Sequence, residues 1–142
     1  MKFFALATAL AGVALVTTGV AAAVLPMDAP VKMGDITAVC SGVGSDKDSN
    51  SFASYPIRLE FSNSGAQFVS NEHVKLMNNT GAVLAEFDCQ GPWVLLQLPK
   101  GLYSVTASIA GSTQAPATVK FSPPPTGQKR VGIQFRAEAP NQ

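Results

Sequence analysis

Apolar and hydroxyl-bearing residues alternate in the stretch from Tyr103 to Ile109, which reads YSVTASI. A period of two residues is typical of a strand that buries one face and exposes the other. The LPKG sequence at 98–101 combines a proline, which presets φ, with a glycine, which accepts positive φ, as a tight turn requires. The stretch from Gly91 to Gly111 therefore predicts a strand, a turn and a second strand.

The same alternation returns in other short segments. Turn residues separate these segments, as in NSG at 63–65 and NNTG at 78–81. Pro116 places its segment at the edge of a sheet, because proline lacks a backbone N–H. Short strands at roughly ten-residue spacing, without a sustained helical period after the N-terminus, predict an all-β fold in which two antiparallel sheets form a sandwich. We expect further strands at 36–42, 57–62, 66–70, 73–77, 83–88, 115–121 and 131–135.

Residues 1–23 have the pattern of a secretion signal: Lys2, an uncharged apolar run from Phe3 to Val16, and Ala21 and Ala23 at an A-x-A-like cleavage site. An uncleaved membrane anchor is the alternative, but the run is short for a span of roughly 20 residues. Removing 23 of the 142 residues leaves 119, which suits one domain. We expect a lead-in segment at 24–35, one sandwich domain at 36–136 and a polar tail at 137–142.

The mature chain is electrically neutral, because loss of Lys2 takes the formal charge from +1 to zero. A neutral chain shows no electrostatic preference for nucleic acid or for an anionic membrane surface. We therefore expect a periplasmic or secreted protein with no nucleic-acid partner and no membrane span after signal cleavage.

Two cysteines, Cys40 and Cys89, remain after signal removal. An even number of cysteines in an exported chain favours a disulfide, and two allow a single intramolecular pairing. The closed loop would span 49 positions, for which the chain-entropy relation gives roughly 4 kcal/mol. Each cysteine lies near a glycine, so we expect a covalent link between two strand ends. A reactive or metal-binding pair is the alternative, but the chain has no CxxC motif and a single histidine.

The sequence from Val74 to Ala107 resembles carboxypeptidase regulatory-like domains, which belong with the prealbumin-like and Cna-B-like sandwiches. The most specific part is the L-P-x-G-x-Y-x-V pattern from Leu98 to Val105, and the resemblance covers about residues 55–136. It implies a seven-stranded Greek-key sandwich of a bacterial exported protein, used as an accessory, structural or carbohydrate-contacting module. The pattern is tied to folding, so it carries no activity to this chain.

This chain does not have the residue pattern required for two activities known in similar sandwiches. Transthyretin-related hydrolases use several histidines and a C-terminal Tyr-Arg-Gly-Ser, whereas this chain has only His73 and ends in APNQ. Cna-B-like domains often carry a Lys–Asn cross-link promoted by a buried acid. Lys75, Lys120, Asn78 and Glu86 are present, but Lys75 alternates onto the polar face with His73, which argues against the bond.

Other candidate sites have simpler explanations. The DKDSN sequence from Asp46 to Asn50 resembles the opening of a calcium loop, but Ser51 and Ile57 replace the usual glycine and glutamate, so a solvated loop is favoured. His73 lacks an identifiable partner for acid–base catalysis. Asn78 begins an N-glycosylation sequence, but beside a bacterial-looking signal we assign it to turn chemistry; a eukaryotic secretory pathway could add a glycan there. We expect no enzyme activity, no cofactor and no metal.

Trp93 is the remaining candidate. It either anchors the core or offers an exposed ring that stacks on a sugar or a partner protein. Alternation does not decide, since both sets of residues in 93–98 are apolar, which is typical of a strand buried on both sides. The sequence thus predicts a non-catalytic accessory domain that contacts another protein or the envelope. A small carbohydrate-binding module is the alternative.

Overall fold

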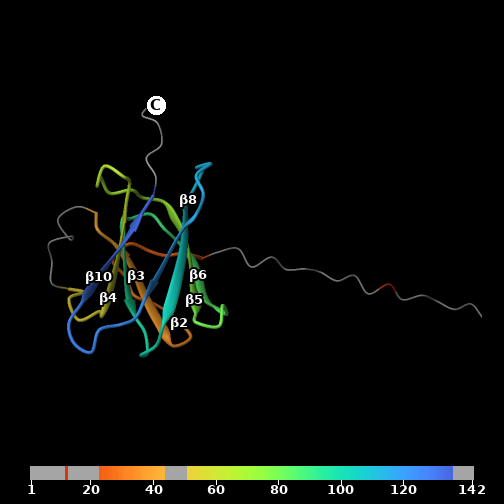
Figure 1. The fold of residues 1–142 in the computed structure, drawn as a ribbon. Helices are drawn as coiled ribbons and strands as arrows, with labels where there is room; N and C mark the ends of the chain where they lie inside the picture. Colours follow the sequence, from red (N-terminus) through yellow and green to blue (C-terminus); the bar gives the residue numbers. More distant parts are fainter. Residues whose placement is uncertain (1–11, 13–22, 44–50, 136–142) are drawn as a thin grey trace, which may run out of the picture.

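The computed structural model describes residue 12 and residues 23–43 and 51–135. Most of the expected signal segment, the candidate calcium loop at 46–50 and the tail at 137–142 lie outside the described residues. The described chain forms two packed sheets of five strands each, which confirms the all-β sandwich (Figure 1). Within the same residues, no helix is long and apolar enough to cross a membrane.

Each sheet combines strands that are distant in the sequence. Sheet A contains, in spatial order, β1 (Ala23–Val24), β6 (Val83–Cys89), β5 (Glu72–Asn78), β8 (Tyr103–Ile109) and β9 (Ala117–Phe121). Sheet B contains, in spatial order, β10 (Lys129–Gln134), β4 (Ile57–Ser62), β7 (Trp93–Gln97), β3 (Ile36–Ser41) and β2 (Val31–Met33). The strand containing Pro116 was expected at an edge, and β9, which begins one residue later, is an edge strand of sheet A.

Three details differ from the sequence prediction. The sheets are mixed, because β1 runs parallel to β6 and β10 runs parallel to β4. Alternation specifies which side of a strand is buried, and that pattern is the same in parallel and antiparallel pairs. The lead-in segment at 24–35 is part of both sheets, through Val24 in β1 and through β2. The segment 66–70 forms only an isolated bridge, between Ser62 and Phe68.

The turn at 98–101 carries the chain from one sheet to the other, since β7 belongs to sheet B and β8 to sheet A. The hydroxyl of Tyr103 donates a hydrogen bond of 2.7 Å to the carbonyl oxygen of Pro99. The ring of Tyr103 also stacks on Phe121, with centroids 5.8 Å apart. The tyrosine of the LPKGLYSV sequence thus fixes the turn and fills the core at this end of the sandwich.

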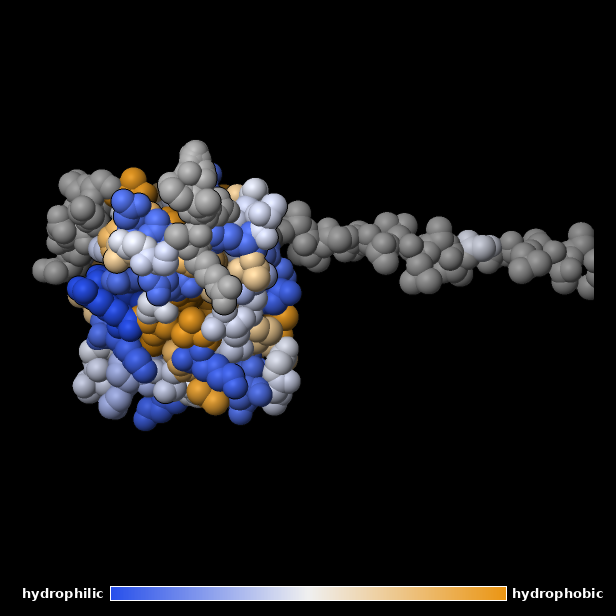
Figure 2. Space-filling view, turned by 45° about the horizontal axis from the view of Figure 1, so that its top comes forward, coloured by the Kyte–Doolittle hydropathy of each residue, from blue (hydrophilic) through white to orange (hydrophobic). Residues whose placement is uncertain are grey.

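The core lies between the sheets and is built by the alternating residues. In β4, β5 and β8 every second side chain is buried, as the sequence predicts. Phe61 of sheet B and Phe87 of sheet A are the largest fully buried side chains. Burial of one such ring contributes about 2–3 kcal/mol. Apolar side chains also reach the surface in the middle of the face shown in Figure 2, where hydrophilic residues border them.

The two sides of the sandwich are closed differently. On the closed side, residues 25–30, here called the strap, cross from sheet A to sheet B. Leu25 N–H donates to the Asp88 carbonyl at 2.9 Å, and Asp28 N–H donates to the Cys40 carbonyl at 2.7 Å. The opposite, open side consists of β9 and β10, which are the outer strands of their sheets.

Candidate functional site

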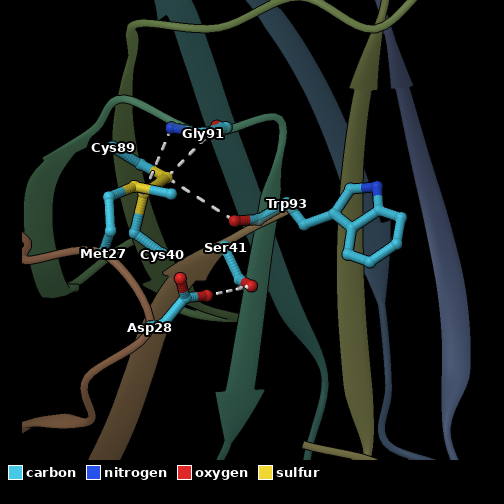
Figure 3. Close-up of a disulfide and its surroundings, with 7 residues drawn as sticks. All are labelled: Met27, Asp28, Cys40, Ser41, Cys89, Gly91 and Trp93. Atoms are coloured by element: carbon cyan, nitrogen blue, oxygen red, sulfur yellow. Dashed lines mark hydrogen bonds between the residues drawn. A yellow bond between two sulfur atoms is a disulfide. The ribbon is translucent and has the colours of Figure 1, made fainter. Parts of the chain in front are cut away.

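The disulfide lies on the closed side and joins β3 to β6 (Figure 3). Cys40 and Cys89 are bonded with their Cα atoms 5.5 Å apart, as predicted, and both are fully buried. Gly91 N–H donates to the Cys40 sulfur at 3.3 Å. A Cβ atom at Gly91 would overlap the backbone carbonyl of Ser41. Tight packing around both sulfurs gives this bond the character of a structural link.

Trp93 lies on the outer face of sheet B. Its neighbours Val94 and Leu96 belong to the core between the sheets, so Trp93 and Leu95 point the other way. Leu95 is nevertheless buried, which confirms that β7 is covered on both faces. In Figure 3 the indole extends away from the disulfide. The half-buried ring therefore lies outside the inter-sheet core.

Three neighbours cover the Trp93 ring. The guanidinium carbon of Arg58 lies 4.3 Å from the ring centroid, a cation–π arrangement. Phe68 packs edge-on with its centroid 6.0 Å away. A Cβ atom at Gly42 would lie 2.9 Å from the indole, so the backbone also approaches the ring closely. Phe68 itself is 55% exposed. The sequence missed it, because Phe68 belongs to a loop rather than to an alternating strand.

His73 lies between two carboxylates on the outer face of sheet A. Its Nδ1 is 2.7 Å from Asp88 Oδ1, and its Nε2 is 2.8 Å from Glu86 Oε1. The hydrogen bonds to Asp88 and then to Glu86 raise the pKa of His73 above its usual value. Because both ring nitrogens contact carboxylates, neither is placed to take a proton from a nucleophile. The described residues contain no group of three or more histidine, cysteine and acidic side chains that could hold a metal ion.

The residues considered for a Lys–Asn cross-link are not assembled around a buried acid. Lys75 lies on the outer face, opposite Glu86 in the β5–β6 register. Asn78 Oδ1 accepts hydrogen bonds from the backbone of Thr80 and Ala82, each 3.0 Å long. The Asn78 side chain therefore stabilises the turn between β5 and β6, as its NNTG sequence suggests.

A groove of about 520 Å³ lies at the end of the sandwich where three turns meet. These turns join β2 to β3, β5 to β6 and β7 to β8. We call this the end groove. Met33, Leu84 and Leu102 contribute apolar surface to it. Leu102 is 50% exposed and Leu84 is 38% exposed, so two leucines face solvent at one place on the sandwich.

A β-bulge lies at Leu84, near the start of β6. Leu76 pairs with Ala85 and Met77 pairs with Val83, so Leu84 is an extra residue in β6. A bulge bends its strand and redirects a side chain, and bulges are frequent beside functional sites. Regular alternation would group Val83 with the buried Ala85, but Val83 is 51% exposed. The sequence therefore missed both the bulge and the groove.

Two charged residues flank the apolar surface of the end groove. Asp35 and Lys100 both line it, and neither side chain makes an ion pair or hydrogen bond in the described structure. Burial and then the charge of Asp35 raise the pKa of Tyr103. The end groove thus combines apolar side chains with one carboxylate and one ammonium group that remain available to a ligand.

Comparison with known proteins adds no family to this description. A scan against protein-family models matches none of them, and a search of curated proteins finds no similar sequence.

Proposed function

We propose that the protein is a non-catalytic exported accessory domain of the carboxypeptidase regulatory-like type, which binds a segment of a partner protein in the end groove. The exposure of Leu84 and Leu102 carries this proposal, because both leucines line one groove of about 520 Å³. Apolar surface of this kind, with a few polar groups around it, is typical of binding sites. The resemblance of residues 98–105 to accessory sandwiches supports the same role.

The chemistry of the end groove defines the partner segment. Its apolar side chain would contact Leu84 and Leu102, and its flanking charges would face Asp35 and Lys100. A segment with a basic residue on one side of an apolar residue and an acidic residue on the other side fits this arrangement. The partner is therefore a protein, soluble or anchored in the cell envelope.

A periplasmic or secreted location is part of the proposal. The buried disulfide supports it, since such bonds persist mainly in oxidising compartments. The signal-like pattern of residues 1–23 supports it as well. The imidazole of His73 supports a non-catalytic role, because both ring nitrogens already contact carboxylates.

Carbohydrate binding at Phe68 and Trp93 is a second candidate. The exposure of Phe68 favours it, because an exposed ring can stack on a sugar. The cover that Arg58 and Gly42 provide over Trp93 counts against it, since a sugar would have to displace the guanidinium group.

Site-specific photocrosslinking tests the choice between these surfaces. A photoreactive residue replaces Leu84, Phe68 or Thr118 in the exported chain, and adducts formed in the native compartment are identified by mass spectrometry. We expect one protein adduct from position 84 and none from positions 68 and 118. The purified adduct partner should then bind Leu84→Asp at least tenfold more weakly than it binds the unchanged protein and Phe68→Ala.

The outcome that contradicts the proposal is equal partner affinity for Leu84→Asp and the unchanged protein. Trp93 fluorescence in the presence of an oligosaccharide panel tests the second candidate directly. A response that disappears in Phe68→Ala but persists in Leu84→Asp would move the binding site to the outer face of sheet B.

A further inference from the structure

Two neighbouring residues at the start of β5 face opposite sides of sheet A. Glu72 points into the sandwich, paired in register with Cys89 of β6 and Ile109 of β8. His73 points outward, paired with Asp88 and Ser108 of the same two strands. The start of β5 therefore places one ionisable group in the core and another on the surface above it, both beside the end of β6.

Glu72 has no partner for its carboxyl group. The residue is 1% exposed, and neither carboxyl oxygen makes a hydrogen bond. The residues paired with it on β6 and β8 are a disulfide cysteine and an isoleucine, and no neighbouring charge contributes to its titration. Burial raises the pKa of the Glu72 carboxyl from 4.5 to about 9, against a smaller lowering by the residue's own backbone N–H. The folded protein consequently holds Glu72 in its neutral, protonated form at neutral pH.

His73 has the opposite surroundings. Asp88 and Glu86 of β6 both contact its ring, at 2.7 and 2.8 Å. From β8 it faces the uncharged Ser108, and on its own strand Lys75 lies opposite Glu86. Two carboxylates against a single imidazole favour the imidazolium form. A proton on His73 therefore holds β5 against the end of β6.

We propose that Glu72 and His73 form a proton-operated latch, which fastens the start of β5 to β6 in acid and loosens as the pH rises. Both groups act in the same direction. An unfolded chain ionises Glu72 near pH 4.5, so the folded state binds an extra proton between pH 4.5 and about 9, and stability falls across that window. The contribution of His73 is complete below pH 6.5 and is lost as the pH rises through its raised folded-state pKa.

This behaviour is the reverse of common acid denaturation, in which paired carboxylates are protonated and stability is lost. A domain with such a latch is suited to work at mildly acidic pH and to be least stable in alkaline surroundings. The latch lies at the start of β5, whereas the end groove lies beyond the other end of the same strand. It can therefore be tested independently of the proposed binding function.

Urea unfolding of the oxidised, mature protein at several pH values tests the latch. We expect the unfolding midpoint to decrease steadily from pH 5 to pH 9. Glu72→Gln, which keeps the shape of the side chain but cannot ionise, should remove most of this decrease and unfold at higher urea than the unchanged protein at pH 8. His73→Asn should remove only the part of the decrease that begins near pH 6.5 and ends as the pH passes through the raised pKa of His73. Asp35→Asn is the matched control and should leave the profile unchanged.

A constant midpoint, or one that decreases toward acid, would overturn the proposal, as would a Glu72→Gln profile parallel to that of the unchanged protein. If Glu72→Gln fails to fold, calorimetry of the unchanged protein gives the same information. Unfolding at pH 7 in buffers of different ionisation enthalpy should release about one proton or more per molecule. Release of no proton would contradict the latch.

Discussion

The closed and open sides of the sandwich differ in whether the two sheets are joined to each other at their edges. On the closed side, the disulfide and the strap join the two sheets directly. On the open side, β9 and β10 simply end their sheets, and Pro116, Lys120 and Arg130 lie along these edges. Proline and cationic side chains discourage pairing with other chains. The closed side thus holds the two sheets together, whereas the edge strands of the open side are protected from pairing with strands of other chains.

Loss of the disulfide should lower the free energy of unfolding more than any other change in this comparison. Replacing Cys40 and Cys89 together by alanine removes the constraint on a 49-residue separation. We expect a loss of about 4 kcal/mol in the free energy of unfolding, measured by urea titration at pH 5. A loss below about 1 kcal/mol would show that the strap and core close this side without the covalent bond.

The buried acid beside Cys89 should weaken the closed side at neutral pH. Glu72→Met removes the carboxyl group while approximately conserving volume, so the unfolding free energy at pH 7 should increase by about 3 kcal/mol. At pH 4 the unfolded chain also keeps Glu72 largely protonated, and we expect the gain to be about 3 kcal/mol smaller than at pH 7. Chemical denaturation at the two pH values measures the difference, and an equal gain at both would contradict the assigned proton.

Substituting one glycine on each side by alanine compares how tightly the two sides are packed. Gly91→Ala forces a methyl group against the Ser41 carbonyl beside the disulfide, whereas a Cβ at Gly132 of β10 meets nothing within 4 Å. We expect Gly91→Ala to cost about 2 kcal/mol and Gly132→Ala to change stability by no more than about 0.5 kcal/mol. Thermal unfolding of both variants gives the comparison, which fails if the two costs are similar.

Removing one side-chain hydrogen bond on each side should give the smallest difference in unfolding free energy between the two sides. On the closed side the Ser41 hydroxyl donates to Asp28 of the strap at 2.5 Å. On the open side Thr106 and Thr118 share an exposed hydrogen bond of 3.0 Å. We expect Asp28→Ala to cost about 1.5 kcal/mol, because its acceptor is charged, and Thr118→Ala about 0.5 kcal/mol. Denaturant titrations in parallel would refute this order if Thr118→Ala proved the more harmful.

The sequence predicted the features that depend on local order or on simple counting. Alternation in 57–61 and 103–107 identified which side chains enter the core, and two cysteines in one chain allowed a single pairing. The strand β2 escaped prediction because it has three residues and is stabilised mainly by its partner β3. Such pairing joins residues through backbone hydrogen bonds, which leave little trace in the side chains.

The candidate site was harder to predict than the fold. The end groove depends on where three turns meet in space, and the bulge at Leu84 leaves Val83 exposed although alternation would bury it with Ala85. No local pattern marks that insertion, since VLAEF alternates imperfectly whether or not a bulge is present. Alternation left the position of Trp93 undecided, because its cover depends on Arg58 and Phe68, whose positions come from another strand and a loop.

The first strand has a consequence for the signal cleavage that we propose. The bond expected to be cut joins Ala23 to Val24, and both residues pair with β6 in the folded domain. Peptidases attack accessible, unpaired backbone much more readily than backbone held in a sheet. A leader that is removed at this bond must therefore be released before sheet A is complete. Maturation would precede folding, and delayed processing would leave a domain that shields its own scissile bond.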